Sequence, residues 1–174
     1  MNKEEFLQLA PELGPIFTNA DHIDIKTEAS NNPLRSFMVG ALSYHPRWMK
    51  FLYGIRYYFV RLLGMTQEGM PEALQLNEED ISMTPGEWVT FFQVTQAKED
   101  AYWVGEATEK HLTAYLAIAV DDSQAEQLVH LATVVKYNHW TGPVYFNVIR
   151  PFHHIVVRQM MRAAAKYTPA MTTA

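Results

Sequence analysis

The chain has 174 residues, of which 48% are hydrophobic, a formal net charge of -5 and no Cys. This length suits one domain with a sizeable core, and the missing Cys excludes disulfides, thiolate metal sites and Cys nucleophiles. The first six residues carry acids where a signal peptide would carry a basic and apolar run. We therefore expect a single domain over residues 1–174, located in the cytoplasm, with residues 167–174 as a flexible tail.

Charge is distributed unevenly along the chain. Residues 66–126 hold two Lys and Arg against thirteen acids, whereas residues 127–174 hold five Lys and Arg and no acid. The acidic net charge and the pI near 5.8 argue against a nucleic-acid partner. The most aromatic stretch, 48–63, is interrupted by Lys50, Arg56 and Arg61, so we expect no transmembrane segment.

The first half of the chain indicates helices around one strand. Helical spacing predicts a short helix over Asn2 to Leu9, and alternation predicts a strand over His22 to Thr27. Asn32-Pro33 is typical of a helix start, with Asn32 as N-cap, and His45-Pro46 repeats the signal. Two helices are therefore expected, Pro33 to Ser43 and Pro46 to Leu63. Residues 66–86 lack periodicity and are interpreted as an acidic excursion with at most a short helix.

An antiparallel meander is predicted next. The strand-like runs are separated by turn signals and cover residues 87–96, 101–106, 112–120 and 128–137. In the run from Leu112 to Val120 one face is uniformly aliphatic, so it must be buried, while the other face is only mildly polar.

A long helix is predicted from Pro143 to Lys166. On a helical wheel its apolar arc includes Phe152, extends on one side through His153, Phe146 and Val157, and is about 200 degrees wide, which is about twice what packing on one sheet needs. Such a helix must be covered on two sides, or lie on a sheet while roofing a cavity. Pro151 in its interior predicts a kink.

One stretch carries a family resemblance. The run from Asn138 to Val156 with its Tyr-Phe, Ile and Pro-Phe-His spacing, preceded by His111 to Leu116, resembles the small bacterial proteins grouped as domain of unknown function 2867. Ala20 to Asp24 and Pro46 to Trp48 fit the same pattern. The resemblance implies an α+β helix-grip fold similar to START-like and Bet v 1-like proteins, in which a curved antiparallel sheet wraps a long C-terminal helix around an apolar cavity. It carries over no catalytic residue.

Residues near the proposed kink are the candidate ligand contacts. His153 lies on the apolar side of the helix, as a hydrogen-bonded core histidine or as a ligand or acid-base group, while His154 is expected in solvent. His22 and Asp24 share one strand face but lack a third ligand at diagnostic spacing, so no metal site is predicted. The expected ligand-binding residues are Tyr145, Ile149, Arg150, Phe152, His153 and Val156.

Three functions remain open. The favoured one is binding of an apolar small molecule or lipid in a cavity between sheet and C-terminal helix. One alternative is a cyclase-like or hydratase-like enzyme that uses His153 or a tyrosine in the same cavity. The other is an interaction protein that docks on a membrane or partner through Arg158, Arg162 and Lys166. Phosphate loops and Rossmann fingerprints are absent from the sequence, so no cofactor is expected. The ligand and the oligomeric state stay open.

Overall fold

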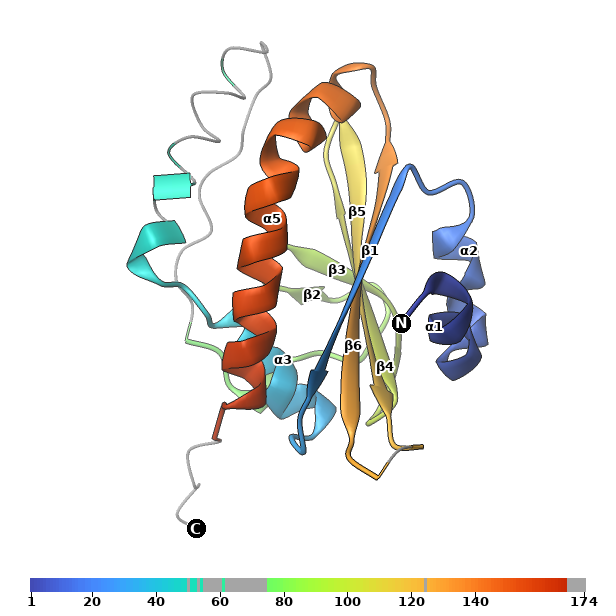
Figure 1. Cartoon of the computed structure of the whole chain (residues 1–174), viewed down its shortest axis with the longest axis vertical. Helices are drawn as coiled ribbons and strands as arrows, with labels where there is room; N and C mark the ends of the chain where they lie inside the picture. Colours follow the sequence, from blue (N-terminus) through green and yellow to red (C-terminus); the bar gives the residue numbers. More distant parts are fainter. Residues whose placement is uncertain (50, 53, 55–60, 62–74, 124, 169–174) are drawn as a thin grey trace.

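The computed structural model describes residues 1–49, 51–52, 54, 61, 75–123 and 125–168. Its centre is a six-stranded antiparallel sheet with the order β1-β6-β5-β4-β3-β2 (Figure 1). The last five strands follow one another as a meander, and the first strand pairs with the last along all eight of its residues. The strands are β1 (His22–Ala29), β2 (Trp88–Val89), β3 (Phe92–Lys98), β4 (Tyr102–Thr108), β5 (Leu112–Asp121) and β6 (Leu128–Tyr137).

All the predicted strands are present, with one difference in the first strand of the meander. The run expected over residues 87–96 divides into β2 and β3, which pair as a tight hairpin. Thr90 lies in the connection with a φ of 57°, a left-handed conformation that a β-branched residue rarely adopts. Because no Gly or Asn marks this reversal, the sequence pattern did not reveal it.

Both faces of the sheet are covered. In β5 and β6, Leu116, Ile118 and Leu131 pack against the helices on one face. The opposite face carries the small residues Ala117, Ala119 and Ala132, which allow close approach of the N-terminal segment. This segment comprises α1 (Lys3–Leu9), η1 (Pro11–Leu13) and α2 (Gly14–Phe17), on the right in Figure 1. The mildly polar face expected from the sequence is therefore a second buried layer.

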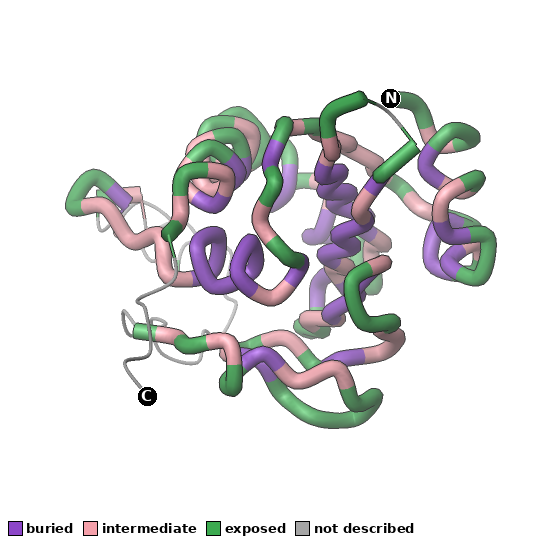
Figure 2. Tube along the Cα trace, turned by 90° about the horizontal axis from the view of Figure 1, so that it is seen from below, coloured by how far each residue is buried: buried purple, intermediate pink, exposed green. Residues whose placement is uncertain are grey.

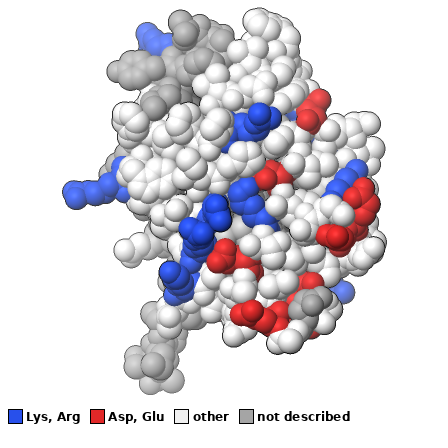
Figure 3. Space-filling model, in the orientation of Figure 1, with Lys and Arg blue, Asp and Glu red and all other residues white. Residues whose placement is uncertain are grey.

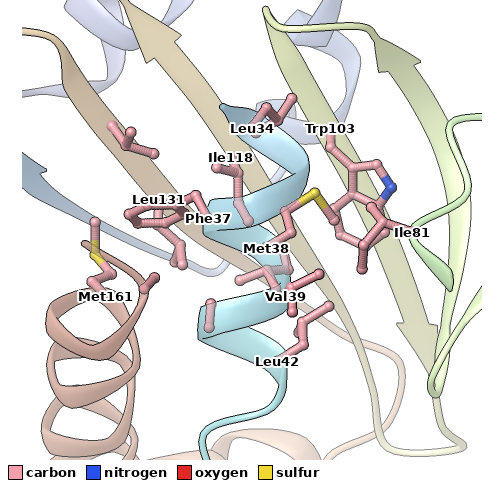
Figure 4. Close-up of a cluster of buried hydrophobic side chains, with 14 of the residues drawn as sticks. Leu34, Phe37, Met38, Val39, Leu42, Ile81, Trp103, Ile118, Leu131 and Met161 are labelled. Carbon is pink, nitrogen blue, oxygen red and sulfur yellow. The ribbon is translucent and has the colours of Figure 1, made fainter. Parts of the chain in front are cut away.

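Helix α3 (Leu34–Leu42) packs beside the C-terminal helix on the same face of the sheet. Its residues Leu34, Ser36 and Phe37 to Leu42 are all buried, and Figure 2 shows it as a buried segment at the centre of the molecule. In Figure 4, Phe37 and Met38 point among side chains of the sheet, close to Trp103 and Leu131. This helix confirms the first of the two predicted helices. The second, Pro46 to Leu63, falls largely outside the described residues.

Asn32 has a different role from the one predicted. The N-cap of α3 is Pro33, and no side chain caps this end. The Asn32 amide instead donates hydrogen bonds to the carbonyl oxygens of Ala164 (2.9 Å) and Tyr167 (2.8 Å). It thereby ties the start of α3 to the end of α5, where the last carbonyls lack the usual i+4 partners of a helix. Tyr167, the first residue of the predicted tail, is held in this way, and residues 169–174 lie outside the described part of the chain.

The described part of the acidic excursion is fastened to α3. It contains one short helix, η2 (Glu78–Asp80), in agreement with the prediction, whereas residues 66–74 are outside the described set. Arg35 of α3 donates to the Ile81 carbonyl and pairs with Glu99 at 2.6 Å. Basic and acidic parts of the sequence therefore meet in the fold at this point.

The C-terminal helix α5 (Thr141–Ala165) runs through Pro151 as one element. Its buried face is one side of the predicted apolar arc. Phe146 and Val157 of that arc, with Met161 beside them, are at most 3% exposed, whereas Phe152, toward the other side of the arc, is 38% exposed. On the wheel the buried face lies roughly 120 degrees away from Phe152. The exposed apolar residues of α5 are Val144, Val148, Phe152 and Ile155.

A curved antiparallel sheet with a long C-terminal helix against it gives the α+β architecture expected from the sequence, consistent with a helix-grip-like fold. The expected apolar space beside the helix is partly occupied, because α3 takes up the half near the C-terminal end of α5. Within the described residues, no helix is long and apolar enough to cross a membrane.

Candidate functional site

Polar side chains meet where β1 lies beside α5. His22, Asp24 and Lys26 alternate along β1, and their pairing partners in β6 are Val135, Thr133 and Leu131. Since paired residues point to the same face of a sheet, all three side chains lie on the face that carries α5. His153 and His154 approach them from the middle of α5. We refer to His22, Asp24, Lys26, His153 and His154 as the β1–α5 cluster.

Asp24 is the centre of the hydrogen bonding in this cluster. Its Oδ2 accepts from the Lys26 ammonium and lies 3.0 Å from His154 Nδ1. Lys26 Nζ is also 3.1 Å from the same His154 nitrogen. Burial alone would raise the pKa of Asp24, but the hydrogen bond and the charge of Lys26, assisted by His154, bring it below its usual value. The carboxylate therefore stays ionised and fixes one edge of the His154 ring.

His153 occupies the interior side of the cluster. Its Nε2 lies 3.2 Å from the Thr133 hydroxyl of β6, and its ring lies 6.4 Å from that of Phe146. Burial lowers the pKa of His153 to about 4. The imidazole is therefore neutral at pH 7 and can accept or donate one hydrogen bond at each nitrogen, depending on its tautomer.

His22 is the third imidazole of the cluster. Its ring packs against Phe146 at 4.8 Å and lies 6.1 Å from the ring of His154. Burial lowers the pKa of His22, and the nearby Asp24 opposes this effect. Its Nε2 is buried and has no hydrogen-bond partner among the described residues. A buried polar atom without a partner costs free energy, so this nitrogen is a position where a ligand or water would be stabilised.

The cluster shows no metal-binding geometry. No group of three or more His, Asp or Glu side chains in the described part of the chain is arranged to hold a metal ion. His22 and Asp24 do share one strand face, as predicted, but the ammonium of Lys26 is the cation that Asp24 contacts.

An apolar surface lies next to the β1–α5 cluster, near the N-terminal end of α5, with Phe146 in contact with both. Ala107 and Ala114 are paired across β4 and β5, and both are half-buried. Ala114 and Ile149 pack against a small core formed by Leu112, Val135, Tyr145 and Phe146. Helix α3 packs on Leu116 of the same strand face. Small side chains on the sheet thus face an aliphatic side chain of α5.

The six predicted ligand-binding residues lie in different environments. Tyr145 is buried with its ring 4.5 Å from that of His111, and Ile149 and Val156 are half-buried. Arg150 and Phe152 are exposed. Only His153 belongs to the β1–α5 cluster, and the role of all six residues as ligand contacts stays a prediction.

Sequence reasoning missed two members of the cluster. His154 was expected in solvent, yet it contacts Asp24 and its side chain is 39% exposed. Lys26 was not considered at all. The available signal was the spacing of His22, Asp24 and Lys26, which places three titratable groups on one face of a strand. The sequence could not show that this face meets α5.

The chain is an α+β protein in which a long C-terminal helix packs on an antiparallel sheet. Its titratable cluster lies between that helix and the edge strand β1. The chain belongs to the family described as protein of unknown function (DUF2867), whose model matches residues 14–160. The resemblance drawn from the sequence is thus confirmed at the family level. No curated protein matches the chain. No solved structure matches it either.

Proposed function

We propose that the protein binds an apolar small molecule or lipid between the sheet and the N-terminal half of α5. The proposal rests on the small side chains that the sheet presents to α5. Ala107 and Ala114 lie on the face of the sheet against which Ile149 packs. Ala114 and Ile149 remain only half-buried. An apolar ligand would complete the burial of this surface.

A polar anchor would have to accompany the apolar contact. If a ligand buried about 300 Å² of apolar surface, it would gain about 7 kcal/mol, against an association cost of about 4 kcal/mol or more. The surplus alone gives weak binding. His153 is a suitable anchor because it is neutral at pH 7 and lies on α5 one turn after Ile149. A ligand with one hydroxyl or carbonyl group at the end of an apolar body would suit this arrangement.

Native mass spectrometry and a neutral fluorescent probe test the proposal. The purified protein should carry a non-covalent small molecule, or should bind N-phenyl-1-naphthylamine saturably. Ala114→Leu should weaken probe binding at least about fivefold, because the added volume occupies the proposed space. The matched control is Ala29→Leu, since Ala29 lies exposed at the end of β1. Absence of both a bound molecule and saturable fluorescence contradicts the proposal.

The pKa of His153 favours one further candidate. A half-buried imidazole that is neutral at pH 7 can act as a general base in a cyclase or hydratase. Its hydrogen-bond partner, however, is a threonine hydroxyl, and among the described residues no carboxylate forms a hydrogen bond or ion pair with it. We therefore rank catalysis below binding. A hydratase would add the mass of one water to the captured compound, and a cyclase would isomerise it. If either change occurs with the wild-type protein and not with His153→Gln, the protein is an enzyme and not only a binding protein.

A further inference from the structure

A basic groove lies between β1 and the C-terminal half of α5. It is open to solvent, with a volume of about 310 Å³, which corresponds to roughly ten water molecules. The lining residues are Lys26, Thr27 and Glu28 of β1 and Arg158, Met161 and Arg162 of α5. Figure 3 shows Lys and Arg atoms running down this face of the molecule, over α5 and β1. The groove is separate from the apolar surface near Ala114.

The cations along α5 follow a regular spacing. Arg150, His154, Arg158, Arg162 and Lys166 occur every four residues. Residues four apart lie on neighbouring turns of a helix, so their side chains form a stripe that winds around the helix by about 40 degrees per step. His154 contacts Asp24, as described above, whereas Arg158 and Arg162 form no ion pair with a described residue. These two guanidinium groups are therefore available to an external anion.

Two lining groups limit the net charge of the groove. The Lys26 ammonium is already engaged by Asp24, and Glu28 contributes a carboxylate. The positive charge that a ligand would meet thus comes mainly from Arg158 and Arg162. Arg162 also lies in the last turn of α5, where a cation is favoured by the helix dipole. The dipole alone does not account for Arg158, which lies one turn earlier, or for the groove that both side chains line.

We propose that this groove binds a small phosphate-bearing molecule, with Arg158 and Arg162 as its two main contacts. Guanidinium groups bind phosphate through paired N–H donors, and they are less strongly hydrated than ammonium groups. Side chains one helical turn apart can both reach one phosphate group. Thr27 lines the groove as well, but its hydroxyl lies 2.8 Å from His130 Nδ1, so the two arginines remain the main contacts. Two arginines with one opposing carboxylate predict a dissociation constant in the millimolar range for inorganic phosphate.

Titrations followed by nuclear magnetic resonance test this site in the full-length protein. Inorganic phosphate and phenyl phosphate are added at constant ionic strength, with chloride as the reference salt. Arg158→Gln and Arg162→Gln should each weaken phosphate binding at least about fivefold. Arg150→Gln is the matched control, because Arg150 lies on the same stripe but does not line the groove. Glu28→Gln should tighten binding about threefold, since it removes the opposing carboxylate.

Three results would overturn the proposal. The first is the absence of saturable shifts at Arg158 and Arg162. The second is an equal loss in Arg150→Gln, which would indicate attraction by the general charge of the helix. The third is binding to vesicles that contain phosphatidic acid without binding of soluble phosphate, which would indicate a membrane surface instead of a groove. Binding of N-phenyl-1-naphthylamine should be unchanged in Arg158→Gln, so this site and the apolar site can fail independently.

Discussion

His154 Nδ1 lies 3.0 Å from Asp24 Oδ2, and this contact joins α5 to the edge strand β1 across 130 positions of sequence. The same carboxylate accepts a hydrogen bond from Lys26, so Asp24 contacts both Lys26 and His154. Because β1 contacts the rest of the sheet only through β6, the helix and the strand stabilise each other at this point.

Asp24→Asn should therefore weaken the attachment of β1. The substitution keeps the shape of the side chain but removes the charge that Lys26 and His154 face, in a position that is 17% exposed. We expect a loss of about 1–2 kcal/mol in the free energy of unfolding, less than for a fully buried pair. Urea unfolding measures the loss. Glu28→Gln, on the same strand face, should change stability by less than about 0.5 kcal/mol. Equal effects of the two variants would contradict a special role for Asp24.

Stability should fall as the pH drops below 6.5, because of His153. The pKa of His153 is about 4 in the folded protein, against 6.5 for the free side chain. Between these values the unfolded chain binds a proton that the folded protein does not, so stability rises with pH through this window. Through His153, the free energy of unfolding is therefore lower by about 3 kcal/mol at pH 4 than at neutral pH. The lowered pKa of His22 acts in the same direction.

His153→Gln isolates this effect. The amide can keep a hydrogen bond to Thr133 but does not titrate, so the decrease in stability between pH 6.5 and pH 4 should become smaller. Chemical unfolding at several pH values measures the slope. The exposed His139, changed to Gln, controls for the loss of one imidazole. The interpretation is wrong if both variants show the same slope.

The orientation of α5 can be tested with two phenylalanines. Phe146 is 3% exposed and Phe152 is 38% exposed. Phe146→Ala should cost about 3–5 kcal/mol, because it removes a buried ring and leaves a cavity. Phe152→Ala should cost less than about 1 kcal/mol. Thermal or urea unfolding compares the two directly, and the opposite order would contradict the buried face that the structure shows.

The contact between α3 and α5 depends on Gly40. A Cβ at this position would lie 2.6 Å from Tyr167 Cβ and 2.8 Å from Ala164 Cα, so the helices would have to move apart. Gly40→Ala should cost about 1–3 kcal/mol. Gly14→Ala is the matched control, since no atom lies within 4 Å of its added Cβ. In that helical position the substitution should be neutral or slightly stabilising. A stable Gly40→Ala protein would show that the packing is looser than the structure indicates.

The candidate site could be predicted only in part. The position of His153 on the apolar side of a helix identified it, and the alternation of β1 placed His22 and Asp24 on one face. That these two features form one cluster depends on the pairing of β1 with β6, which brings Asp24 opposite Thr133. Pairing between the first and last strands leaves no local signal in either segment, because the paired residues are 99 to 113 positions apart in the sequence.

Local patterns in the sequence determined the strands, the long C-terminal helix and the family, since alternation and helical spacing are properties of short segments. Only the tertiary structure decided which side of α5 faces inward. An apolar arc of about 200 degrees offers several possible packing faces. Contacts with α3 and β6 select the one that contains Phe146, Val157 and Met161 and leave Phe152 partly in solvent. The same choice turns His154 toward Asp24, so the polar cluster is a consequence of how the helix packs.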